Sequence, residues 1–256
     1  PSLKTVNGHL STKNRTQGFP KLEHVGRTAK FIGMKGDVPL LKTIGRDANF
    51  ESWEGNAPLL ETIGGEAMFD DWKGNALNLR VIKGAAVFHT YQGEVPSLTR
   101  IGGDAYIQNY KGVLESLRYV GGELYIPQGE VGLPALEEVK GSVTFSGWKN
   151  DAPKLKRIDG SAYFTQWEGK APLLETIGEN ADFTEWAGDA TSLESIGRNA
   201  KFTYWKGKAP LLRSIGATAT FTEWTQNAPS LETIGSNAVF SGWKGNAPAL
   251  GVIVGD

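Results

Sequence analysis

One spacing constrains this 256-residue chain more than any other feature, because all eight tryptophans are separated by multiples of 19 residues. They are Trp53, Trp72, Trp148, Trp167, Trp186, Trp205, Trp224 and Trp243. Most of the prolines share a second position of the same register, and no insertion or deletion interrupts it. A fixed period near 20 residues is typical of a solenoid, in which each repeat is one coil that buries its apolar side against its neighbours.

Thirteen full repeats, up to residue 247, and a partial one account for the whole chain. We therefore expect residues 1–256 to form a single solenoid. Counted from the proline, the consensus reads P-x-L-[E/K/R]-x-I-G-x-x-A-x-F-x-x-W-x-G-x-A, as in residues 39–57 and 172–190. We number these repeat positions 1 to 19 and call one repeat a coil.

The consensus predicts one strand and one helical turn in each coil. Apolar positions 10 and 12, such as Ala48 and Phe50, alternate with polar positions 11 and 13, which predicts a short strand with one buried face. The apolar spacing of positions 19, 3 and 6, the proline at position 1 (Pro58) and the frequent Asn or Asp at position 18 (Asn56) predict a capped turn of 3₁₀ or α-helix.

Glycines and charges add two further expectations. Every repeat has glycine at position 7 or position 8, so we expect a corner there that needs either a positive φ angle or a close backbone approach. Position 16 alternates in sign from Lys35 to Glu54 to Lys73, and position 4 alternates similarly. Opposite charges side by side on neighbouring strands contribute about 0.2–1 kcal/mol, so the alternation predicts coils stacked in register.

Two segments carry a resemblance to a known superfamily. Residues 98–107 (L-T-R-I-G-G-D-A-Y-I) and 117–126 (L-R-Y-V-G-G-E-L-Y-I) resemble leucine-rich repeats, above all the short I-G-G-x-L-x-L repeats of bacterial and phage proteins. The resemblance implies a right-handed parallel β-solenoid with a binding or scaffolding role, and it carries no catalytic residues. The chain departs from that pattern in having tryptophan where leucine-rich repeats use asparagine, and in its slightly shorter coil.

The tryptophans have two interpretations. An exposed ladder of indoles would suit a polysaccharide chain, whereas a buried ladder would be the core. Position 15 lies three residues after the buried phenylalanine position, and eight exposed tryptophans in one row would make an apolar patch far larger than monomers usually show. We therefore expect an aromatic core in which each indole N–H donates to a turn carbonyl.

Composition excludes several classes of function. A net charge of −1 argues against binding of nucleic acid, which needs clustered Lys and Arg. The absence of cysteine excludes disulfides and thiolate metal sites, and no apolar run approaches the length that spans a membrane. No cofactor-binding or metal-binding motif is present, so we expect neither a cofactor nor a metal. Compartment and oligomeric state stay open.

The repeats between Leu77 and Leu133 are the irregular ones, and functional residues are expected where a repeat is broken. Outward position 11 carries Tyr106 and Tyr125 in consecutive repeats, which predicts a pair of neighbouring rings suited to anchoring a protein partner. The predicted binding patch consists of His89, Tyr106, Gln108 and Tyr125. The alternative, that these central coils drifted or adjust curvature, stays open.

One arrangement raises the question of catalysis. Position 13 reads Glu51, Asp70 and His89 in consecutive coils, and neighbouring carboxylates can raise one pKa for acid catalysis. The column continues through Gln108 and Pro127 without insertions that would build a groove, so we expect a solvated face and no enzyme.

The sequence thus predicts a non-enzymatic repeat scaffold for protein interaction or structural display. The alternative is a carbohydrate-binding or carbohydrate-cleaving adhesin, surface- or phage-associated. The direction in which the tryptophan ladder points discriminates between the two.

Overall fold

The computed structural model describes residues 2–255, which form two compact units. Unit 1 comprises the residues up to Glu123 together with Gly129–Pro134, and unit 2 comprises Leu124–Gln128 and the residues from Ala135 onward. Each unit is a parallel β-solenoid with 19-residue coils. The organisation of the whole chain as a single solenoid stays a prediction.

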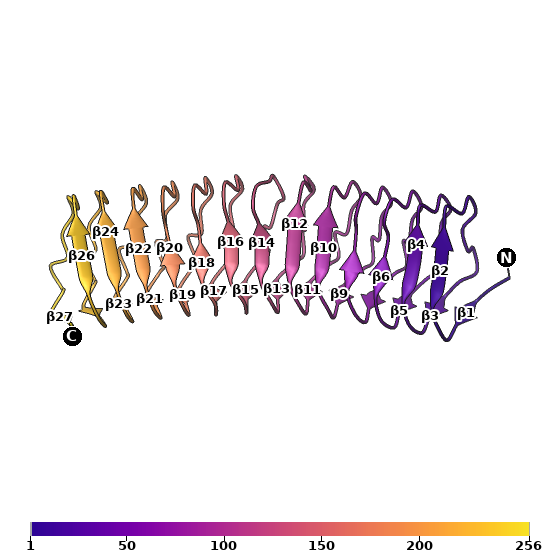
Figure 1. Cartoon of the computed structure of the whole chain (residues 1–256), viewed down its shortest axis with the longest axis horizontal. Helices are drawn as coiled ribbons and strands as arrows, with labels where there is room; N and C mark the ends of the chain where they lie inside the picture. Colours follow the sequence, from indigo (N-terminus) through magenta and orange to yellow (C-terminus); the bar gives the residue numbers. More distant parts are fainter. Residues whose placement is uncertain (1, 256) are drawn as a thin grey trace. The chain divides into compact units, whose positions relative to one another are not determined.

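In unit 1 each coil contributes one strand to each of two parallel sheets, and neighbouring strands in each sheet come from consecutive coils (Figure 1). Sheet A of unit 1 contains β1 (Thr5–Val6), β3 (His24–Val25), β5 (Thr43–Ile44), β7 (Thr62–Ile63), β9 (Val81–Ile82), β11 (Arg100–Ile101) and β13 (Tyr119–Val120). Sheet B of unit 1 contains β2 (Leu10–Lys13), β4 (Ala29–Ile32), β6 (Ala48–Asn49), β8 (Ala67–Met68), β10 (Ala86–His89) and β12 (Ala105–Gln108).

Unit 2 repeats the arrangement with strands at the same repeat positions. Sheet A of unit 2 contains β15 (Glu138–Val139), β17 (Arg157–Ile158), β19 (Thr176–Ile177), β21 (Ser195–Ile196), β23 (Ser214–Ile215), β25 (Thr233–Ile234) and β27 (Val252–Ile253). Sheet B of unit 2 contains β14 (Leu124–Ile126), β16 (Val143–Phe145), β18 (Ala162–Tyr163), β20 (Ala181–Asp182), β22 (Ala200–Thr203), β24 (Ala219–Thr222) and β26 (Ala238–Ser241).

Sheet B confirms a strand that begins at position 10. The strand reaches position 13 in β10 and β12 and stops at position 11 in β6 and β8. The register of sheet B shifts by one repeat from strand to strand, so that Ala86 pairs with Ala105 and Phe88 with Ile107. Positions 10 and 12 are buried while positions 11 and 13 point outward, as the period of two requires. Sheet A was not predicted, because its strands cover two residues at positions 5 and 6, too few to show an alternating pattern.

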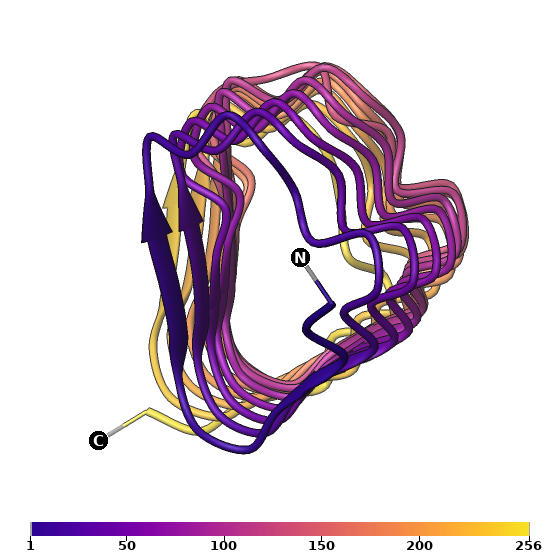
Figure 2. The ribbon, with the colours of Figure 1, turned by 90° about the vertical axis from the view of Figure 1, so that its right-hand side faces the viewer.

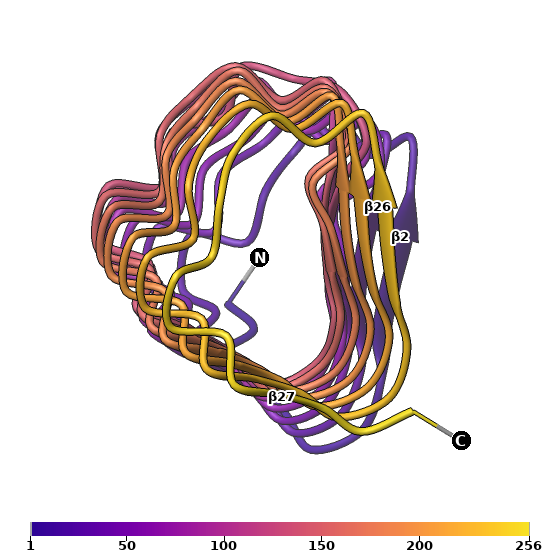
Figure 3. The same ribbon diagram turned by 90° about the vertical axis from the view of Figure 1, so that its left-hand side faces the viewer.

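Seen end-on, the coils of each unit follow one another closely as loops, with sheets A and B on different sides (unit 1 in Figure 2, unit 2 in Figure 3). The predicted helical turn is wrong, since residues 2–255 contain no helix. Pro58 instead occupies the second position of a four-residue β-turn, closed by a 3.1 Å bond from the N–H of Leu60 to the carbonyl of Ala57. The turn is not continued because the N–H of Glu61 donates to Lys42 of the preceding coil.

The helix cap predicted at position 18 is also wrong, because the side chains there bond to the next coil. The backbone N–H of Asn56 donates to Oδ1 of Asp37 at 2.7 Å, and that of Asn75 donates to Oδ1 of Asn56 at 3.0 Å. These side chains satisfy backbone donors that face the neighbouring coil, where no regular strand pairing exists. The result is a ladder of side-chain to backbone hydrogen bonds that joins consecutive coils at position 18.

Of the two explanations for the glycine at position 7 or 8, close backbone approach is confirmed. A Cβ on Gly45 would lie 2.1 Å from the carbonyl oxygen of Gly26 in the preceding coil, and the φ of Gly45 is not positive. Gly8 belongs to the first coil of the described residues, which has no coil before it, and nothing lies within 4 Å of its Cβ position. Positive φ angles occur instead at position 14, as at Asn109 (56°) and Gly147 (64°). That position follows the strand of sheet B and turns the chain out of it.

The tryptophans form the predicted aromatic core. The rings of Trp53 and Trp72 in unit 1 are parallel with centroids 5.0 Å apart, and those of Trp167 and Trp186 in unit 2 are parallel at 5.1 Å. All four side chains are fully buried. The indole of Trp186 donates to the carbonyl of Gly169 at 2.8 Å.

Equivalent indole bonds are present in both units. The donors and acceptors are Trp53 and Gly36, Trp72 and Gly55, Trp167 and Asn150, Trp205 and Gly188, Trp224 and Gly207, and Trp243 and Gln226. Where position 17 is glycine the coils approach closely, because a Cβ on Gly188 would lie 2.1 Å from the carbonyl oxygen of Gly169 and 2.7 Å from the indole nitrogen of Trp186. The bond does not require glycine, since Trp224 makes it in a coil that has Gln226 at this position.

The charge ladder predicted at position 16 is confirmed in unit 1. Glu54 lies between two lysines of the neighbouring coils, 3.6 Å from Lys35 and 3.4 Å from Lys73. The field of Lys35, with a hydrogen bond and further attraction from Lys73, lowers the pKa of Glu54. Ion pairs between equivalent positions of neighbouring coils show that these coils are stacked in register.

Candidate functional site

Three of the four predicted patch residues lie together on the outward face of sheet B in unit 1. His89 in β10 and Gln108 in β12 are direct neighbours in the parallel register, and Tyr106 lies two residues before Gln108 in the same strand. They share one face because outward positions 11 and 13 alternate with the buried positions 10 and 12. The backbone therefore brings these side chains together without any insertion in the repeat.

The fourth residue, Tyr125, lies in unit 2. It occupies the outward position of β14, is 42% exposed, and pairs in register with Thr144 of β16. Because Tyr106 and Tyr125 belong to different units, the side-by-side packing of their rings stays a prediction.

Tyr106 belongs to an apolar strip that the sequence interpretation did not define. Met68 in β8, Val87 in β10 and Tyr106 in β12 are consecutive partners in the register of sheet B. Met68 and Tyr106 are each 39% exposed, and Val87 is half-buried. We call these three residues the apolar strip. It would have been visible in the sequence by reading position 11 down the repeats.

The surroundings of the apolar strip are acidic. The hydroxyl of Tyr106 donates to Oδ2 of Asp104 at 3.4 Å, and the charge of that carboxylate raises the pKa of Tyr106. Outward positions 9, 11 and 13 of unit 1 carry six carboxylates and two lysines. The carboxylates are Asp47, Glu51, Glu66, Asp70, Asp104 and Glu123, and the lysines are Lys13 and Lys30.

The column considered for catalysis forms one specific contact. Nδ1 of His89 lies 2.8 Å from Oδ1 of Asp70 in the preceding coil, with both side chains partly exposed. Glu51, one coil further, is exposed, and its backbone N–H bonds to the side chain of Asn49. Within residues 2–255 no group of three or more His, Cys, Asp or Glu side chains is placed to hold a metal ion.

The broken core positions of the irregular repeats keep the architecture of the regular ones. Tyr91 and Tyr110 take the tryptophan position, stay buried, and donate to the carbonyls of Gly74 and Gly93 as the indoles do elsewhere. Burial raises the pKa of Tyr110 to about 12. These two substitutions therefore keep the ring and its bond inside the core, whereas Gly129, at the same position one repeat later, has no ring.

Two grooves on sheet B were missed in the sequence interpretation. Both are lined by positions 9 and 11, which flank the inward-pointing position 10, and each has a volume of about 360 Å³. The groove in unit 1 is lined by His9, Thr28, Lys30, Asp47, Ala48, Asn49, Glu66 and Met68. The groove in unit 2 is lined by Tyr163, Asn180, Ala181, Asp182, Asn199, Ala200, Lys201, Thr218 and Thr220.

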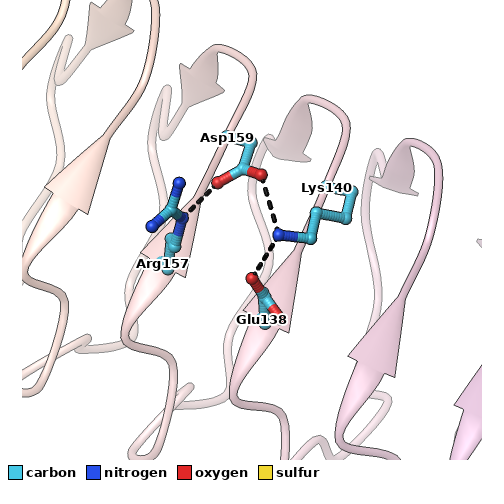
Figure 4. Close-up of polar contacts among 4 residues, drawn as sticks. All are labelled: Glu138, Lys140, Arg157 and Asp159. Atoms are coloured by element: carbon cyan, nitrogen blue, oxygen red, sulfur yellow. Dashed lines mark hydrogen bonds and ion pairs between the residues drawn. The ribbon is translucent and has the colours of Figure 1, made fainter.

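A cluster of four charged side chains lies on sheet A of unit 2 (Figure 4). Lys140 bridges Glu138 of its own coil, at 2.6 Å, and Asp159 of the next coil, at 3.0 Å, and Arg157 also bonds to Asp159. Burial alone would raise the pKa of Asp159, but the hydrogen bonds from Arg157 and Lys140 outweigh it and the pKa is lowered. The charges balance within the cluster, so its clearest effect is to join two coils in register.

Comparisons with known proteins return no match, whether the chain is compared with family models, with curated proteins or with solved structures. In the part of the chain between residues 2 and 255, no helix has the length and apolar character needed to cross a membrane.

Proposed function

We propose that the protein is a non-enzymatic repeat scaffold that binds a protein partner through the outward face of sheet B in unit 1. The observation that carries the proposal is the apolar strip of Met68, Val87 and Tyr106, which is exposed in an otherwise polar sheet face. Aromatic residues and methionine are enriched at the centres of protein interfaces. His89 and Gln108 supply polar contacts at its edge.

The charge around the strip defines the partner further. Six carboxylates against two lysines on this face give it a negative field. A partner with an apolar centre and a rim of Lys or Arg would complement it, and such complementarity accelerates association and selects the partner. Binding of this kind weakens as salt is added, because the rim charges are exposed to solvent.

Two observations support a scaffold in preference to an enzyme or an indole-based sugar platform. Asp70 is engaged by His89 on an open, partly exposed face, with Glu51 still more exposed. Seven of the eight tryptophans are buried inside the coils, and only Trp243 is half-buried, so the indoles form no exposed ladder for a polysaccharide.

The same proposal includes the finer details of the fold. We propose that the coils are right-handed, because crossovers between parallel strands of one sheet are right-handed in nearly all proteins. Kinship with leucine-rich repeats rests on the L-x-x-I-G-G pattern of residues 98–107 and 117–126. The coil without a helix, built from two sheets, departs from that pattern.

The test is a comparison of equivalent tyrosines on the two units. Tyr106→Ser in unit 1 and Tyr163→Ser in unit 2 alter the same repeat position at similar exposure, so each should change the free energy of unfolding by less than about 1 kcal/mol. Immobilised wild type and Tyr163→Ser should retain the same basic protein from a native extract, and Tyr106→Ser should not. Raising the salt concentration should release it.

Retention of that protein by Tyr106→Ser at undiminished yield would contradict the proposal. The proposal is also contradicted if immobilised wild type retains no protein that resin without the chain does not retain.

A further inference from the structure

We propose that the groove on sheet B of unit 2 binds a linear, uncharged polysaccharide. This site is separate from the apolar strip of unit 1, and it uses none of the residues assigned there.

The groove runs along the axis of unit 2. Its lining comes from β18, β20, β22 and β24 and from the residues just before them, so it crosses four consecutive coils. At the spacing of neighbouring strands this corresponds to a length of about 14 Å. A shallow groove of this form fits an extended chain better than a compact small molecule.

The groove carries no net charge. Asp182 and Lys201 are the only charged residues in its lining, and they pair with each other, with Nζ of Lys201 3.5 Å from Oδ2 of Asp182. The neutrality extends over the whole outward face, since these two are the only charged residues at positions 9, 11 and 13 between Tyr125 and Ser241. A polyanion or polycation therefore finds no complementary field here.

Hydroxyl and amide groups dominate the rest of the face. Asn180 and Asn199 line one side of the groove, and Thr218 and Thr220 lie at its end. Amides and hydroxyls both donate and accept hydrogen bonds. Asn180 and Asn199 already bond to each other and to the neighbouring coils, with Nδ2 of Asn199 2.9 Å from Oδ1 of Asn180. Their remaining donor and acceptor capacity and the threonine hydroxyls can pair with sugar hydroxyls without burying an unpaired charge.

Aromatic rings complete the chemistry. Tyr163 lines the groove and is 42% exposed, and Tyr125 lies on the same outward column two coils away, with Thr144 between them. Two strand spacings place their backbones about 9.6 Å apart. That distance is close to the length of a disaccharide in an extended polysaccharide, so alternate sugar rings could rest their C–H faces on the two tyrosines.

The groove of unit 1 shows which features are specific. It occupies the same repeat positions with the same volume, but it has no tyrosine in its lining and carries Lys30, Asp47 and Glu66. A protein interface would need a larger apolar centre than Tyr163 and two alanines provide. The unit 2 groove thus combines neutrality, hydrogen-bonding groups and rings in a way that the unit 1 groove does not.

Affinity electrophoresis of the intact chain tests the proposal. The gels contain hydroxyethyl cellulose, galactomannan, dextran or soluble starch as neutral polysaccharides, and polygalacturonate as an acidic one. At least one neutral polysaccharide should retard the protein, with an effect that is insensitive to salt. Tyr163→Ala should weaken the retardation about tenfold, and Tyr163→Phe, which keeps the ring, should stay within about twofold.

Tyr106→Ala in unit 1 is the matched control, and it should bind as wild type does. Circular dichroism melts establish that each variant is folded. The proposal is overturned if no neutral polysaccharide retards the protein, if Tyr163→Ala binds as wild type does, or if polygalacturonate alone retards it. It is equally overturned if Tyr163→Ser loses the protein that wild type retains from an extract, because the groove would then be a protein interface.

Discussion

The outward faces of sheet B in units 1 and 2 are built on the same backbone and carry different chemistry. In unit 1 the face holds the apolar strip and an excess of carboxylates. In unit 2 it holds rows of Ser, Thr and Asn with tyrosine rings and one internal ion pair. Inward positions barely differ, since Ala, Phe and Trp recur in both units. The coil therefore fixes where side chains point, and the outward positions are free to specialise.

The largest expected effect tests whether the two cores are as equivalent as they look. Trp72→Ala in unit 1 and Trp186→Ala in unit 2 each remove a fully buried, stacked indole, and each should lower the free energy of unfolding by about 3–5 kcal/mol. Denaturant melts measure the loss, and Trp243→Ala, at a half-buried ring, should cost less. If either Trp72→Ala or Trp186→Ala lowers the free energy of unfolding by less than about 1 kcal/mol, the two cores are not equivalent.

A second test concerns the close approach of coils at position 17. Gly74→Ala and Gly188→Ala would place a Cβ 1.8 Å and 2.1 Å from the carbonyl oxygen of the preceding coil, so each should destabilise its unit by about 1–3 kcal/mol. Gly8→Ala is the matched control, because nothing lies within 4 Å of its Cβ position. If chemical denaturation shows equal stability for all three variants, the coils are spaced more widely than described.

Backbone strain at position 14 allows a gain of stability that should differ between the units. Tyr204 in unit 2 is 54% exposed with a φ of 52°, so Tyr204→Gly should raise the free energy of unfolding by up to about 1 kcal/mol. Thr90→Gly in unit 1 should gain less, because the hydroxyl of Thr90 donates to Asp71. Thermal melts compare the two, and a fall in Tm for Tyr204→Gly would contradict the assigned backbone.

The smallest effects concern the charges that join coils. The pKa of Asp159 in unit 2 and that of Glu54 in unit 1 are lowered in the folded state, so their contribution to stability is complete above the unfolded values near 3.8 and 4.5. It is lost as the pH falls through the lower, folded-state values. Titration followed by NMR should show Lys140→Met raising the pKa of Asp159, and Lys73→Met raising that of Glu54. Unchanged midpoints would mean that the lysines do not contact these carboxylates in solution.

The features that could be predicted from the sequence are those that repeat at a local spacing. The alternation around Phe50 predicts the strand of sheet B, and the position of Trp53 three residues later predicts a buried ring with a bonded indole. The period of 19 then predicts the register, which the pairing of Ala86 with Ala105 confirms.

The features that were predicted wrongly or missed depend on contacts between coils. Pro58 and Asn56 have the spacing of a helix start, but the donors that a helix would use bond to the preceding coil. The apolar strip and the groove of unit 2 require reading one position down many repeats, because neighbours on the face are 19 residues apart in the chain. Neither the strip nor the groove can therefore be predicted from the residues of a single repeat.

Tryptophan fluorescence tests most directly the central claim that aromatic rings build the core while the outward face binds. The indoles should emit at short wavelength, be quenched poorly by acrylamide, and keep the same spectrum when a neutral polysaccharide is added, because the ladder lies inside the coils. Emission at long wavelength with strong quenching, relieved by the polysaccharide, would contradict the account and make the tryptophan ladder the binding surface.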